Sequence, residues 1–65
     1  MTVNEVYKKV TSEGYKVNLI GIVNKNDDWR KAEFEYADEF METEGDREVF
    51  DFAIQAQQRL LLLKF

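Results

Sequence analysis

The chain has 65 residues with 13 acidic and 9 basic side chains, a net charge of −4, and neither cysteine nor histidine. This length predicts one small acidic domain over residues 1–65, and the composition excludes disulfides, thiolate metal sites and cysteine or histidine nucleophiles. Because 45% of the residues are hydrophobic, we expect a folded chain and not a disordered one.

The chain shows neither a secretory signal nor a membrane span. It does not open with a basic segment followed by an apolar one, and its apolar stretches are shorter than the ~18 residues that cross a bilayer. We therefore expect a cytoplasmic protein with no membrane partner.

Residues 3–13 are predicted to form a short amphipathic helix. Thr2 and Glu5 have the spacing of a capping box, and Gly14 stands where a C-terminal cap belongs. Apolar side chains recur at the helical spacing i, i+3, i+4 and i+7: Val3, Val6, Tyr7, Val10.

Residues 15–24 are predicted to form a strand, because apolar and polar side chains alternate over its first half. The alternation slips near Gly21, which is typical of a bulge or of a strand covered on both faces. A strand needs a partner for its backbone groups, and the nearest one is a hairpin return after the polar turn 24–28.

Residues 29–41 fit two secondary structures. As a strand over 29–37, Ala32, Phe34 and Tyr36 face inward while Glu33 and Glu35 face water, and a loose acidic connection through Gly45 follows. As a helix over 28–43, most of the apolar residues share one face, and the preceding strand then pairs with a second copy of the chain. The need for a strand partner favours the first of these.

Residues 46–63 are predicted to form a longer helix. Asp46 can cap its N-terminus, and Arg59 and Lys64 lie near its C-terminus, where positive charge is favoured. Four apolar residues do not fit on its one apolar face: Phe52, Leu62, Leu63, Phe65.

The predicted fold is therefore α+β, with a short N-terminal helix, an antiparallel hairpin and a longer C-terminal helix in the order α-β-β-α. The alternative is α-β-α-α, with the strand paired across a homodimer.

The acidic residues are concentrated in the middle of the chain. Eleven of the 13 lie between Asp27 and Asp51 with only three basic residues, so this window carries about −8. Such a block disfavours direct binding to nucleic acid and favours a protein partner with a basic surface. The predicted partner-binding residues are Asp28, Trp29, Glu33, Glu35, Asp38, Glu39, Glu42.

No motif for catalysis, a metal or a cofactor is present. The nearest is a partial calcium loop beginning at Asn24, but Trp29 occupies the position that requires glycine. The leading hypothesis is a small non-enzymatic regulator or inhibitor that binds a larger protein through its acidic face. In one variant the carboxylates mimic nucleic-acid phosphates in the partner's binding cleft. In composition alone, the chain resembles small acidic proteins of phages and mobile elements.

The apolar C-terminus supports a second hypothesis, a homo-oligomeric structural or accessory protein whose acidic surface serves solubility. Four successive leucines would point around the whole circumference of a helix, so part of them could form a homodimer interface. The same residues could instead belong to the core or dock a different protein. The candidate interface residues are Leu60, Leu62, Leu63, Phe65.

Overall fold

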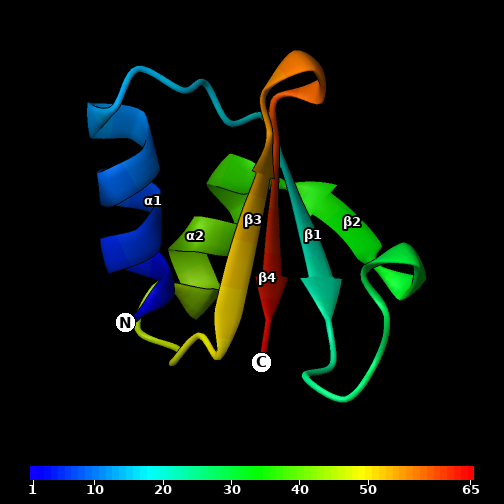
Figure 1. Cartoon of the computed structure of the whole chain (residues 1–65). Coiled ribbons are helices and arrows are strands. Elements are labelled where there is room, and N and C mark those ends of the chain that lie inside the picture. The colour runs from blue at the N-terminus through cyan, green and yellow to red at the C-terminus, as the bar shows by residue number, and fades with distance from the viewer.

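A computed structural model of residues 1–65 shows an α+β fold in which two helices pack on one face of a four-stranded mixed sheet (Figure 1). The elements follow in the order α1 (Val3–Ser12), β1 (Leu19–Val23), β2 (Glu33–Tyr36), α2 (Ala37–Glu44), β3 (Asp51–Gln55) and β4 (Leu60–Lys64). The predicted α+β class is confirmed, whereas the predicted order α-β-β-α is wrong. Neither helix has the length and apolarity that a membrane crossing requires.

The sheet consists of two antiparallel hairpins joined side by side, in the strand order β2-β1-β4-β3. The first hairpin is β1 with β2, and the second is β3 with β4. The two are joined by a parallel ladder between β1 and β4, in which Leu19 is opposite Leu60 and Val23 is opposite Lys64. The first and last strands of the chain are therefore central, and β2 and β3 are the edges.

Helix α1 begins and ends as its sequence predicts. The Glu5 amide donates to Thr2 Oγ1 at 3.2 Å, and the Thr2 amide donates back to Glu5 Oε1 at 2.8 Å, which completes the capping box. Gly14 has φ +99°, and the amides of Gly14 and Tyr15 donate to the carbonyls of Thr11 and Val10. This Schellman arrangement needs the left-handed backbone that glycine adopts without strain.

The core lies between the helices and the sheet. Val3 and Val6 of α1 and Phe40 of α2 pack against side chains that the central strands send to the same face: Ile20, Leu61, Leu63. Because Ile20, Leu61 and Leu63 have no exposed surface, β1 and β4 form the centre of the fold.

The predicted helix over 46–63 is wrong, because this segment forms the hairpin of β3 and β4. All four leucines of β4 are buried, Leu61 and Leu63 against the helices and Leu60 and Leu62 on the far face. A continuous apolar run covered on both faces is the pattern of a central strand. The residues that did not fit on one helical face are thus explained by strand geometry.

Residues 29–41 contain parts of both predicted structures. The strand is present but shorter, as β2, and the predicted acidic connection is helix α2, which starts at the next residue. The rival helix over 28–43 with a strand paired across a homodimer is wrong, because β1 pairs with β2 in the same chain. The strand predicted over 15–24 starts only at Leu19 and pairs through Gly21 in unbroken register, without a bulge.

The predicted facing of β2 is also reversed. Phe34 and Tyr36 were expected inside, but their side chains are 57% and 66% exposed. Their β1 partners Gly21 and Leu19 show that they lie on the sheet face opposite the helices, because Ile20 between them points into the core. A Cβ on Gly21 would collide with the Leu62 side chain and lie 3.3 Å from the Phe34 ring. The absence of a side chain at Gly21 therefore allows Leu62 and Phe34 to pack over the backbone of β1.

The turn between β3 and β4 contains one strained residue, and we expect Arg59→Gly to stabilise the fold. Arg59 has φ 53°, in the left-handed region that costs a non-glycine residue about 1–2 kcal/mol. Glycine loses about 0.5–1 kcal/mol through the flexibility of its unfolded state, so the expected net gain is up to about 1.5 kcal/mol. Arg59→Val should destabilise, because a β-branched residue tolerates positive φ poorly. Urea unfolding measures both, and equal stability of the two variants would contradict the strain.

The capping box predicts an acid dependence that Glu5→Gln should reduce. The pKa of Glu5 is below its ordinary value, chiefly because the Thr2 backbone amide donates a hydrogen bond to its carboxylate. A carboxyl whose pKa is lower in the folded state stabilises fully above its unfolded pKa of about 4.3 and loses that contribution as pH falls through the folded pKa. The wild type should therefore be more stable than Glu5→Gln at pH 7, and the difference should shrink at pH 3. A constant difference in urea unfolding would contradict this.

Candidate functional site

The most charged part of the molecule is built by β2 and α2, which follow each other without a loop. Tyr36 ends the strand and is also the N-cap of the helix, with φ −66° and ψ 137°. Glu33 and Glu35 are opposite Ile22 and Ile20 in the ladder, so they point to the same sheet face as the helices. Together with the exposed carboxylates of α2 they form what we call the acidic surface: Glu33, Glu35, Asp38, Glu39, Glu42.

The carboxylates of the acidic surface have no cationic partner in the protein. The ion pairs of the chain join the N-terminal amine to Glu48, Arg30 to Asp28, and Arg47 to Glu44. Asp38 Oδ1 accepts the Glu39 amide at 2.9 Å, and negative charge in the first turn of α2 is favourable. The other carboxylates are left to solvent, so their charge is available to an external cation.

Asp28 and Trp29 were predicted with these residues but have local roles in the connection between β1 and β2. Asp28 caps the short 3-10 turn Trp29–Lys31 and accepts from the Arg30 amide at 2.9 Å and from Arg30 Nε at 3.1 Å. The Arg30 side chain is the main reason that the pKa of Asp28 is below its ordinary value. Trp29 is half-buried, with the Lys64 ammonium 4.5 Å from the centre of its ring.

The sequence interpretation missed the exposure of Phe34 and Tyr36. Both rings stand on the side of β2 opposite to Glu33 and Glu35, so one short strand shows carboxylates on one face and aromatic rings on the other. The sequence predicts the alternation of apolar and charged side chains along this strand, but it places the apolar side in the core. Large exposed apolar side chains beside charge are typical of protein interfaces.

The four candidate oligomer-interface residues are packed within one chain. Leu60, Leu62 and Leu63 of β4 are buried, with exposed fractions of at most 8%. Phe65 is half-buried, 6.2 Å from the Phe40 ring and 4.0 Å from the Arg47 guanidinium. The packing of a single chain therefore accounts for the apolar C-terminus.

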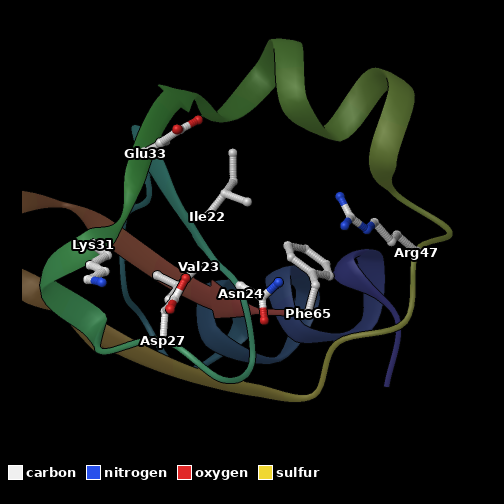
Figure 2. Close-up of a pocket in the computed structure, with 8 residues that line it drawn as sticks. All are labelled: Ile22, Val23, Asn24, Asp27, Lys31, Glu33, Arg47 and Phe65. Atoms are coloured by element: carbon white, nitrogen blue, oxygen red, sulfur yellow. The ribbon is translucent and has the colours of Figure 1, made fainter.

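A hollow of about 350 Å³ adjoins Glu33 on the helix side of the sheet (Figure 2). Figure 2 shows Arg47 and Glu33 on opposite sides of it, with the Phe65 ring between them. Asp27 and Lys31 also line it, so two acidic and two basic side chains are present. Because these charges balance, the hollow does not select an anion or a cation, and the acidic surface remains the stronger candidate.

Comparisons with protein-family models, with curated protein sequences and with solved structures find no match to this chain.

Neutralising the acidic surface should leave the fold intact, because none of its carboxylates forms an ion pair in the protein. We expect a variant with five amides (Glu33→Gln, Glu35→Gln, Asp38→Asn, Glu39→Gln, Glu42→Gln) to change the free energy of unfolding by no more than about 0.5 kcal/mol per site. At low salt it should be slightly more stable than the wild type, since like charges no longer repel, and salt should reduce that difference. Thermal unfolding at two salt concentrations measures both effects.

The matched control is Asp28→Asn, which removes one charge from a carboxylate that caps a turn and binds Arg30. This single change should lower the midpoint of unfolding. If the five-amide variant lost its helical circular dichroism, these carboxylates would be needed for folding. That result would contradict the prediction that they only contact solvent.

Proposed function

We propose that the protein is a small non-enzymatic regulator or inhibitor that binds a larger protein with a basic surface. The observation that carries the proposal is the acidic surface itself: five exposed carboxylates on two consecutive elements, none paired within the chain. Such a concentration of one charge raises the association rate with an oppositely charged partner, and it suppresses binding to partners of like charge.

The exposed rings of Phe34 and Tyr36 add the apolar component that a stable complex needs. Charge steers encounter, but most of the binding energy at an interface comes from a few well-packed side chains, in which aromatic residues are enriched. Because these rings are on the same strand as Glu33 and Glu35, one partner could contact both.

A narrower form of the proposal gives the partner a nucleic-acid-binding cleft in which the carboxylates take the place of phosphates. This form predicts that double-stranded DNA and the protein compete for the same partner. Simultaneous binding of both would exclude the narrower form without affecting the general one.

The proposal is tested by capturing partners from an extract of the native host with the tagged wild type and the five-amide variant. A partner of the acidic surface should be retained by the wild type at low salt and released at high salt. The five-amide variant should not capture it at either salt concentration. Partners are identified by mass spectrometry, and their affinities are then measured with purified proteins.

The matched control separates the position of the charges from the net charge. It neutralises five other exposed acidic residues: Glu13→Gln, Asp27→Asn, Asp46→Asn, Glu48→Gln, Asp51→Asn. This variant has the same net charge as the five-amide variant and should keep the partner. Equal capture by both variants would contradict a role for the acidic surface.

A further inference from the structure

Strand β2 is an open edge of the sheet. It pairs with β1 and with no other strand (Figure 1). All four of its residues are exposed. An open edge presents unpaired backbone N–H and C=O groups, which can pair with a strand of another molecule.

The register of the ladder shows which backbone groups are free. The Ala37 amide donates to the Asn18 carbonyl at 2.9 Å, so the backbone of Ala37 faces β1. The Leu19 amide donates at 3.2 Å to the carbonyl of Arg59 on the β4 side, so it does not face Tyr36, its partner in the register. Because inward and outward pairs alternate in an antiparallel ladder, the amides of Phe34 and Tyr36 point away from β1.

The side chains of β2 define what would fit beside it. Neighbouring residues on adjacent strands point to the same face of the sheet. A strand added to this edge would therefore place alternate side chains next to Glu33 and Glu35 on the helix side. The intervening side chains would lie next to Phe34 and Tyr36 on the far side. Basic residues complement the first pair, and apolar residues complement the second.

We propose that the open edge of β2 binds an extended segment of the partner, in which basic and apolar residues alternate, by β-strand addition. The inference rests on the proposed function and adds to it the conformation and the sequence pattern of the bound segment. Main-chain hydrogen bonds to Phe34 and Tyr36 hold the segment, and the side chains on its two faces select its sequence.

The same geometry argues against a second copy of the chain at this edge. Two copies joined through β2 with their helices on one side would place Glu33 and Glu35 of one beside Glu35 and Glu33 of the other. Like charges directly opposite each other destabilise a ladder. A copy turned over would set the carboxylates beside aromatic rings without a cation. A basic segment removes this repulsion, so the carboxylates select a foreign strand over self-pairing.

The test uses two synthetic peptides of equal composition, one alternating lysine and valine and one with all lysines before all valines. Both offer the same charge to the acidic surface, but only the alternating peptide matches both faces of β2. We expect the alternating peptide to bind at least tenfold more tightly, in a titration followed by nuclear magnetic resonance. It should also slow hydrogen exchange at the amides of Phe34 and Tyr36, which binding by charge alone would leave unprotected.

The matched variants are Tyr36→Pro and Tyr36→Ala. Tyr36 has φ −66°, the value that proline imposes, and its outward N–H makes no bond in the sheet, so both variants should fold. Both lose the ring, but only proline removes the N–H and blocks the edge. We expect Tyr36→Pro to bind the alternating peptide at least tenfold more weakly than Tyr36→Ala.

Several results would overturn strand addition by a partner segment. Equal binding of the two peptides, or equal binding by the two Tyr36 variants, overturns strand addition and leaves the acidic surface as a purely electrostatic site. Failure of the alternating peptide to bind at millimolar concentration also overturns strand addition. The proposed function is still tested separately, by partner capture with the wild type and the five-amide variant. A wild-type dimer in sedimentation that Tyr36→Pro converts to monomer would assign the edge to a second copy.

Discussion

The fold depends on the burial of β4 on both of its faces. Leu61 and Leu63 pack under the helices, while Leu60 and Leu62 are covered on the far face, so the last strand occupies the centre of the sheet. Its parallel ladder with β1 is also the only strand pairing between two hairpins that would be marginal alone. These central strands also position the acidic surface. Strand β2 pairs with β1 alone and is therefore an edge, and α2 packs on the apolar face that the central strands provide.

The C-terminal hairpin was not predicted because its sequence also satisfies the rules for a helix. Asp46 suits a helix N-cap, and the turn between the strands has no glycine, proline, asparagine or aspartate to mark it. Arg59 takes the left-handed position that glycine or asparagine usually fills, so the usual signal of a hairpin is missing. The one feature that disagreed with a helix was the excess of apolar residues, because Leu62 and Leu63 do not lie on its apolar face. Periodicity alone cannot distinguish a short buried strand such as β4 from a segment of a buried helix.

Local signals were sufficient where the structure is stabilised locally. The cap residues Thr2 and Gly14 predicted both ends of α1, since a cap depends on its immediate neighbours. The exposure of Glu33 and Glu35 was predicted for a related reason, because an unpaired charge stays in water whichever element carries it. Which face of β2 the helices would cover depends on contacts between distant segments. Periodicity alone therefore could not predict which face of the sheet carries Phe34 and Tyr36. The exposure of these two rings beside the acidic surface is visible only in the fold.

The ladder between β1 and β4 also has a consequence for how the chain folds. Leu19 is paired with Leu60, so the centre of the sheet joins segments near opposite ends of the sequence and cannot form until the last strand is present. During synthesis the apolar segment around Ile20 is therefore made well before its main partner. The acidic residues that follow it are already present at that stage, and mutual repulsion between nascent chains opposes their aggregation. The charge for which we propose a role in recognition would thus also protect the chain before it has folded.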